Sequence, residues 1–262
     1  MKNTTFIIIL CIIFIIIFIY IIDKICNSSE SLDYFIYDSK IKGPTIMIIG
    51  GTHGNEPSGH YAIKNLINSL NNKDIELQSG KLILVPSVNY CALKVGIRMI
   101  PTIGDLNRKY PTNLNNLITH CPTTNKIVNL VKNADFVLDF HEGWGFNRLN
   151  KNSMGSSITP SITSKSHDIA KLLLDTVNKT LKDNNKNFII LTKDYKKYNE
   201  TINYDYSESI DIKGSLRYFE NILNKDYILI ETTGQNNIQP LDIRIKQCEL
   251  FINTLLTYYN LI

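Results

Sequence analysis

Short apolar runs alternate along this chain with longer segments that are apolar on one side only. The short runs have the length of buried strands and lie at 45–49, 81–86, 135–140, 187–191 and 227–230. The longer segments predict helices at 57–70, 123–132, 167–181 and 241–259. Strands that alternate with helices predict an α/β domain, in which a mostly parallel sheet is covered by helices on both faces.

The most apolar segment is at the amino terminus. Residues 6–22 carry no charge and almost no polar side chain. This length is at the short end of the range for a membrane-spanning helix, and no typical cleavage site follows it. We therefore expect residues 1–26 to be a signal anchor in a single-pass membrane protein, with a cleaved signal peptide as the alternative. The flanking charges favour a cytoplasmic amino terminus and a lumenal or extracellular location for the rest.

Residues 27–42 are predicted to be a linker, and residues 43–262 are long enough for one domain with a sizeable core. The net charge of +4 is modest and the lysines are dispersed, so no basic block indicates nucleic-acid binding. Outside the apolar segment, the cysteines are widely spaced, at 26, 91, 121 and 248. Disulfides and free thiols are both compatible with this spacing, and we expect free thiols.

A histidine and a glutamate lie three positions apart just after the first predicted strand. Residues 50–56 read GGTHGNE, and side chains at i and i+3 project from the same side of a turn. His53 and Glu56 can therefore bind one zinc ion. His141 ends the strand predicted at 135–140, where α/β sheets form their crevices. It would complete a His-Glu-His set and leave the fourth zinc position open for water or substrate.

Three further segments strengthen this interpretation. They read GDLNRKYP at 104–111, VLDFH at 137–141 and ILIETTG at 228–234. The ordered motifs H-x-x-E, D-L-N-R-x-Y-P, D-F-H and E-T-T-G resemble the zinc carboxypeptidase superfamily, and most closely its succinylglutamate desuccinylase and aspartoacylase branch. The resemblance runs from about residue 43 to residue 244. It implies a mixed sheet sandwiched between helices, and one zinc ion per chain.

The resemblance also implies roles for residues around the metal. Glu231 ends a predicted strand and faces the same crevice, and the family has its general base at the matching position. A guanidinium group binds a carboxylate bidentately, and the matching Asn-Arg pair, here Asn107 and Arg108, holds the substrate's carboxylate in the family. Arg98 lies at the offset where relatives have an arginine that stabilises the oxyanion.

Two acidic residues beside His141 have two interpretations each. Glu142 should face away from the metal if the strand continues, because neighbouring residues on a strand point in opposite directions. It would instead contact substrate if the following glycines begin a loop. Asp139 would orient a metal ligand from behind or cap a strand.

The sequence therefore predicts a membrane-anchored zinc hydrolase of amide bonds. It would remove an acyl group from a carboxylate-bearing amino acid by attack of a zinc-activated water. A metallocarboxypeptidase that trims peptide C-termini would use the same residues and is the alternative. An alternative of another class is a catalytically silent, membrane-anchored binding protein, which loss of Glu231 or of a zinc ligand would have favoured. Many relatives carry a further carboxy-terminal β-rich domain, so we expect a more open site here.

Overall fold

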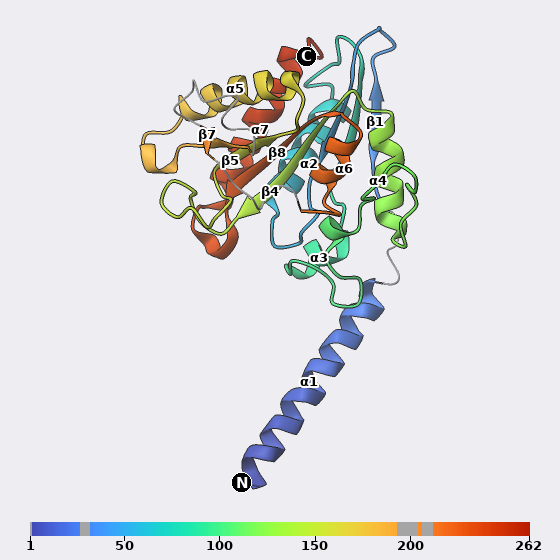
Figure 1. Cartoon of the computed structure of the whole chain (residues 1–262), viewed down its shortest axis with the longest axis vertical. Coiled ribbons are helices and arrows are strands. Elements are labelled where there is room, and N and C mark those ends of the chain that lie inside the picture. The colour runs from blue at the N-terminus through green and yellow to red at the C-terminus, as the bar shows by residue number, and fades with distance from the viewer. Residues whose placement is uncertain (1, 27–31, 193–203, 206–211) are drawn as a thin grey trace.

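The computed structural model describes residues 2–26, 32–192, 204–205 and 212–262 (Figure 1). Within these residues, the centre of the domain is an eight-stranded sheet in the order β1-β3-β2-β4-β8-β5-β6-β7. The strands are β1 (Phe35–Asp38), β2 (Thr45–Ile49), β3 (Lys81–Val85), β4 (Phe136–Gly143), β5 (Ser157–Pro160), β6 (Ile189–Leu191), β7 (Tyr204–Asp205) and β8 (Asp226–Thr233).

The sheet is mixed but mostly parallel, as predicted. Strands β3, β2, β4 and β8 run parallel to one another. Strand β1 is antiparallel to β3, and β5 is antiparallel to β8, whereas β6 and β7 run parallel to β5. Strands β2 and β4 are buried along almost their whole length, which explains why they appear in the sequence as continuous apolar runs.

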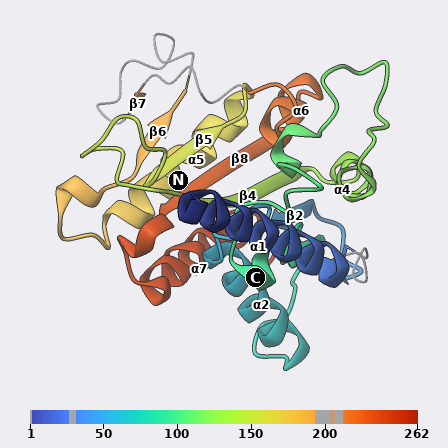
Figure 2. The same ribbon diagram turned by 90° about the horizontal axis from the view of Figure 1, so that it is seen from below.

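Helices cover both faces of the sheet. They are α2 (Ser58–Asn71), α3 (Tyr90–Val95), α4 (Pro122–Lys132), α5 (Ser164–Asn178), α6 (Leu216–Ile222) and α7 (Leu241–Tyr258), with short 3-10 helices η1 (Leu106–Arg108), η2 (Asn184–Lys186) and η5 (Gln235–Asn237). Helices α2, α5 and α7 pack against Ile46 and Ile48, and α4 and α6 pack on the side of Met47 and Ile49. Successive side chains of a strand point to opposite faces, so β2 contributes to both cores. Figure 2 shows α2 and α7 on one side of the sheet and α4 and α6 on the other.

Some elements were not predicted. Strand β1 lies within 27–42, the segment expected to be a linker, and pairs with β3 at the edge of the sheet. Its residues are partly or largely exposed, so they show no simple burial period. Helices α3 and α6 have six and seven residues, which is too short for a helical period to stand out.

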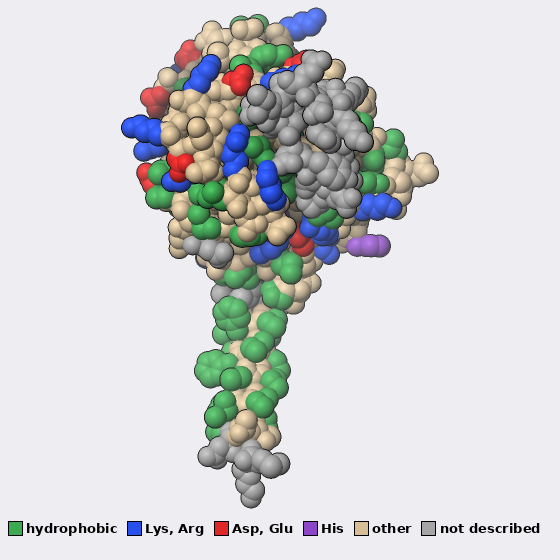
Figure 3. Space-filling model, turned by 60° about the vertical axis from the view of Figure 1, so that its left-hand side comes forward, with side chains coloured by type: hydrophobic (Ala, Val, Ile, Leu, Met, Phe, Trp, Pro, Cys, Tyr) green, Lys and Arg blue, Asp and Glu red, His purple; other side chains and the backbone are tan. Residues whose placement is uncertain are grey.

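The amino-terminal helix α1 (Lys2–Cys26) contains an 18-residue window, 4–21, with mean hydropathy 3.2. None of this window is buried by the rest of the described chain, and apolar side chains cover its visible side in Figure 3. Its length and composition are those of a membrane-spanning helix, and a signal sequence shares them. The helix is therefore compatible with both alternatives predicted from the sequence.

The cysteines differ in state. Cys121 and Cys248 are free and buried, as expected, and Cys11 is free on α1. Cys91, at the start of α3, is disulfide-bonded, so the expectation of free thiols is wrong at this position. Spacing along the chain does not report the distance between sulfur atoms in space, and that distance decides whether a disulfide forms.

Candidate active site

An open pocket lies at the edge of the sheet where β2, β4 and β8 end. Strand β2 leads into the turn with His53, β4 carries His141 near its end, and β8 carries Glu231 directly opposite His141 in the strand register. The pocket is lined by all seven residues predicted to bind metal, to bind substrate or to act in catalysis, namely His53, Glu56, Arg98, Asn107, Arg108, His141 and Glu231. The carboxyl ends of parallel strands are the expected position for such a crevice.

The turn after β2 brings His53 and Glu56 to the same side. Gly51 has a φ of 65°, a conformation that glycine adopts without strain. A Cβ on Gly54 would overlap the backbone of Ala92, so only glycine allows this close approach. The Glu56 N–H donates to the His53 carbonyl at 3.2 Å and closes the turn just before α2 begins.

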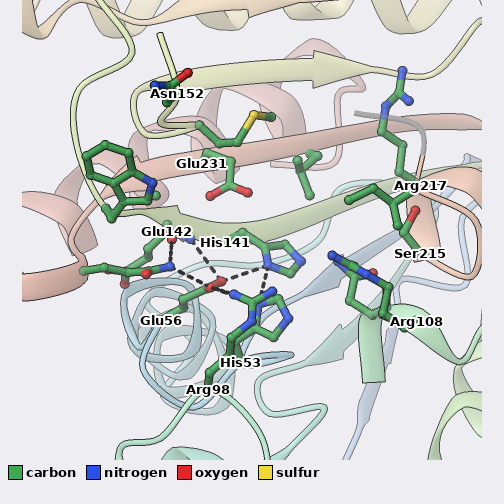
Figure 4. Close-up of a pocket in the computed structure, with 17 residues that line it drawn as sticks. His53, Glu56, Arg98, Arg108, His141, Glu142, Asn152, Ser215, Arg217 and Glu231 are labelled. Atoms are coloured by element: carbon green, nitrogen blue, oxygen red, sulfur yellow. Dashed lines mark hydrogen bonds and ion pairs between the residues drawn. The ribbon is translucent and has the colours of Figure 1, made fainter. Parts of the chain in front are cut away.

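Three buried side chains point their ligand atoms at one place (Figure 4). Nδ1 of His53 lies 2.9 Å from Oε1 of Glu56, and Nδ1 of His141 lies 2.9 Å from Oε2 of the same carboxylate. The two Nδ1 atoms are 3.1 Å apart. Ligands about 2.0–2.2 Å from a tetrahedral zinc ion are separated by about 3.3 Å, so this donor set fits one zinc ion.

The second nitrogen of each histidine faces another carboxylate. Nε2 of His53 is hydrogen-bonded to Oδ1 of Asp105 at 3.1 Å, and Nε2 of His141 lies 3.3 Å from Oδ2 of Asp139. That carboxylate also accepts a hydrogen bond from the Tyr227 hydroxyl at 2.9 Å. A carboxylate behind a metal-binding histidine fixes its ring and its tautomer, and this arrangement leaves both Nδ1 atoms facing the candidate site.

The buried charges stabilise one another. Burial alone would raise the pKa of Glu56, but the charge of His53 and hydrogen bonds from both histidines hold this pKa well below its usual range. Burial works in the opposite direction on His141, where Asp139 and Glu56 outweigh it and raise the pKa. The cluster thus favours an ionised Glu56, which is the form that binds a metal.

Glu231 has a different environment. Its carboxylate points into the pocket on the side of β8, facing the His-Glu-His set (Figure 4). Burial raises its pKa to about 8, and the positive charge of His141 opposes this shift only in part. A carboxylate with a raised pKa, placed beside a metal site, has the properties of a general base.

Arg98 lies beside the Glu56 carboxylate of the candidate metal site and is 41% exposed. Its guanidinium donates to Oε1 of Glu56 at 3.0 Å and to Oδ2 of Asp105 at 3.2 Å. The guanidinium thus places a positive charge beside the Glu56 carboxylate, within the pocket.

Asn107 and Arg108 line the same pocket from η1. Oδ1 of Asn107 accepts the backbone N–H of Leu216 at 3.0 Å, which fixes the amide group against the start of α6. With its oxygen used in this way, the amide offers its NH₂ group to a substrate. Arg108 is exposed and donates to the Asn107 carbonyl at 2.7 Å, so both groups could bind an anion from one side.

Glu142 does not begin a loop, because β4 continues through Gly143. Its carboxylate is 1% exposed, accepts the Ser58 N–H at 2.7 Å and forms an ion pair with Arg244. Its own N–H donates to Oε2 of Glu56 at 3.2 Å. The structure thus places this carboxylate within a buried network, as the interpretation with a continuous strand implies.

Other pocket residues were missed in the sequence. Gln235 donates from its Nε2 to Oε1 of Glu56 at 3.1 Å, and Arg217 lines the pocket from α6 while donating to the Pro160 carbonyl at 2.8 Å. Trp144 lies on the wall and is 41% exposed. Of these three residues, only Trp144 stands out in the sequence, because it is the one tryptophan of the chain and lies three positions after the D-F-H motif.

Comparison with known proteins gives a family match over residues 42–148, to the succinylglutamate desuccinylase/aspartoacylase catalytic domain. The chain is also 35% identical over 103 residues to the N-alpha-acetyl-L-2,4-diaminobutyric acid deacetylase of Halomonas elongata, a match that covers 39% of this chain and 29% of that protein.

Solved structures show the same fold. The tripeptide-bound cell shape determinant Csd4 of Helicobacter pylori matches with a TM-score of 0.70 and 18% identity, covering 88% of this chain and 56% of that one. An aspartoacylase family protein of Mesorhizobium loti matches with a TM-score of 0.59 and 21% identity, covering 88% and 62%. The chain thus spans less than two thirds of the length of each of these relatives.

The family match includes the first three motifs, and β8 brings the fourth to the same pocket. Residues 42–148 thus match the succinylglutamate desuccinylase/aspartoacylase catalytic domain, and the described chain shares its fold with Csd4 and with an aspartoacylase family protein.

Proposed function

We propose that this chain is a zinc-dependent amide hydrolase that removes an acyl group from a carboxylate-bearing amino acid. The observation that carries the proposal is the triangle formed by Nδ1 of His53, Nδ1 of His141 and the Glu56 carboxylate, whose atoms lie 2.9 to 3.1 Å apart. An open pocket that also contains a carboxylate and arginines surrounds this triangle.

His53, Glu56 and His141 would hold the zinc ion. When bound, zinc acts as a Lewis acid that polarises a carbonyl and lowers the pKa of water. The protein supplies the remaining groups. Glu231 takes a proton from the attacking water and passes it to the leaving nitrogen, and burial raises its pKa above the ordinary value, which strengthens it as a base.

The arginines bind the negative charges of the reaction. Arg98, which already lies at the metal-binding carboxylate, stabilises the oxyanion that develops on the carbonyl. Asn107 and Arg108 hold the substrate's carboxylate through the amide NH₂ group and the guanidinium. The substrate class is therefore an anion with its scissile amide close to a carboxylate.

A metallocarboxypeptidase is the second candidate. A deacetylase is among the relatives found by sequence, but Csd4, described as a D,L-carboxypeptidase in its mDAP-bound form, shares the fold with a TM-score of 0.64 at 17% identity. The openness of the pocket, which the exposed Trp144 lines, supports this candidate, because an open pocket leaves room for a longer substrate.

The proposed location follows from α1. An 18-residue apolar window with no buried part suits a membrane anchor, and the flanking charges favour a lumenal or extracellular catalytic domain. Retention of a tag placed before residue 1 in the mature protein would support the anchor, and its loss would indicate a cleaved signal peptide.

The activity is tested with the full chain, purified in detergent and loaded with zinc. Amine release is followed over N-acyl amino acids and over peptides with free or amidated C-termini, with Glu231→Gln as control. Cleavage of short N-acyl amino acids that the control lacks supports the deacylase. Cleavage of peptides alone, and only with a free C-terminus, supports the carboxypeptidase. Zinc-loaded protein that cleaves nothing in the panel contradicts both and favours a silent binding protein.

A further inference from the structure

A buried ion pair lies directly behind the candidate metal site. Glu142 comes from β4 and Arg244 from α7, and their side chains are 1% and 5% exposed. Taking two charges out of water is costly unless further hydrogen bonds satisfy them. A pair of this kind needs an explanation beyond packing, because two apolar side chains would fill the same space at lower cost.

The first explanation is at the start of α2. The N-cap residue, Pro57, provides no side-chain hydrogen bond, so the first N–H groups of this helix need acceptors from elsewhere. Oε1 of Glu142 accepts the N–H of Ser58 at 2.7 Å. A carboxylate from β4 thus caps α2 in place of a local side chain, where a negative charge is favoured by the helix dipole.

This cap is two residues from the metal-binding carboxylate. Glu142 also contacts Glu56 through its own N–H, which donates to Oε2 at 3.2 Å. Gln235 bridges the same two residues, because its Nε2 donates to Oε1 of Glu56 and to the Glu142 carbonyl. Glu56 is therefore positioned in two ways. The capped start of α2 holds the adjacent backbone through Ser58, and the β4 backbone donates to the Glu56 carboxylate.

Arg244 and Gly234 complete the arrangement. The guanidinium pairs with Oε2 of Glu142, the oxygen that does not cap Ser58. It thereby balances a carboxylate that would otherwise be buried close to the negative charge of Glu56. A Cβ on Gly234, the glycine of the E-T-T-G motif, would overlap both Glu142 Oε2 and the Arg244 guanidinium. Glycine at this position leaves space for the pair.

We propose that Glu142 and Arg244 are positioning residues, which place Glu56 for metal binding by capping α2 from β4. The inference rests on the proposed zinc site. It predicts that the affinity of the folded protein for zinc depends on the acceptor that Glu142 offers to Ser58, and not only on the packing of the pair. Partners behind metal ligands typically change metal affinity by about 10- to 100-fold.

Two neutral double variants of the full chain separate these explanations. Glu142→Gln with Arg244→Met removes both charges and keeps an amide oxygen for Ser58. Glu142→Leu with Arg244→Met also removes both charges and offers no acceptor. Zinc affinity is measured by chelator competition at a temperature where circular dichroism shows each protein folded. We expect the first variant to stay within a few-fold of wild type, and the second to bind about 10- to 100-fold more weakly.

A single variant gives a second measurement that changes no charged group. Gly234→Ala would push the pair apart and should weaken zinc binding at least several-fold, with kcat reduced when the site is saturated with zinc. Lys246→Met on the exposed side of α7, where Lys246 is 75% exposed, is the matched control and should change neither value. Equal zinc affinity in the two double variants, or wild-type affinity in Gly234→Ala, would overturn the inference. Wild-type protein that binds no zinc would instead overturn the proposed metal site.

Discussion

Nδ1 of His53 and Nδ1 of His141 lie 3.1 Å apart, although 88 positions separate the two residues in the chain. The adjacent parallel strands β2 and β4 bring them together, because Ile49 at the end of β2 pairs with Asp139 in β4. Each ring has a carboxylate on its other nitrogen, Asp105 for His53 and Asp139 for His141. The orientation of both imidazoles is thus set by neighbouring side chains of the fold itself.

Replacing Glu231 tests the proposed general base. We expect Glu231→Gln to lower kcat by about 10²- to 10⁴-fold, because the amide has the same shape but cannot accept the proton. Zinc affinity should stay close to that of wild type, since the candidate ligands are His53, Glu56 and His141 and do not include Glu231. Steady-state kinetics together with metal analysis check both statements. A comparable loss of zinc would show that Glu231 acts on the metal site and not as the base.

The same substitution tests the raised pKa of Glu231 without any substrate. Its pKa of about 8 in the folded protein exceeds the ordinary 4.5 because the carboxyl is buried. Between these values the unfolded chain has released the proton and the folded chain retains it, so wild-type stability falls as pH rises. Below about pH 4.5 both states are protonated and this contribution is absent.

Metal-free Glu231→Gln should therefore be more stable than metal-free wild type at pH 8, by about 1–4 kcal/mol. The difference should shrink as pH falls and vanish near pH 4.5. Urea unfolding at several pH values measures it. The exposed Glu76→Gln is the control and should show a small difference at every pH. A difference for Glu231→Gln that does not vary with pH would exclude the raised pKa.

Arg108→Met tests recognition of the substrate's carboxylate. A bidentate pair between guanidinium and carboxylate is strong, and hydrogen bonds to charged groups contribute about 1.5–3 kcal/mol. We expect kcat/KM to fall by about 10- to 150-fold for a substrate with a free carboxylate. The amidated form of that substrate is the matched control, and its slower cleavage should be nearly unchanged by the substitution. Equal losses for both forms would show that Arg108 does not bind the carboxylate.

The fold and seven of the residues that line the pocket could be predicted from the sequence. His53 with Glu56 and His141 each directly follow or end an apolar strand, so local pattern and position at the sheet edge agree. Gln235 and Arg244 could not be found in this way. Gln235 reaches Glu56 across 179 positions, and Arg244 reaches Glu142 across 102. Such contacts depend on how η5 and α7 pack, which leaves no local mark in the sequence.

Asp139 allowed two interpretations from the sequence, and a substitution distinguishes them. Its carboxylate is buried, lies 3.3 Å from Nε2 of His141 and accepts the Tyr227 hydroxyl at 2.9 Å. If it orients the ring, Asp139→Asn should weaken zinc binding by about 10- to 100-fold, because the amide can present its NH₂ group to Nε2 and favour the wrong tautomer.

Asp135→Asn is the matched control, since Asp135 accepts the Thr45 N–H at 2.8 Å just before β4 and is remote from the histidines in the sheet register. Chelator competition on both variants gives the answer. Zinc affinity lowered equally by the two substitutions, or by neither, would assign Asp139 to the stability of the strand.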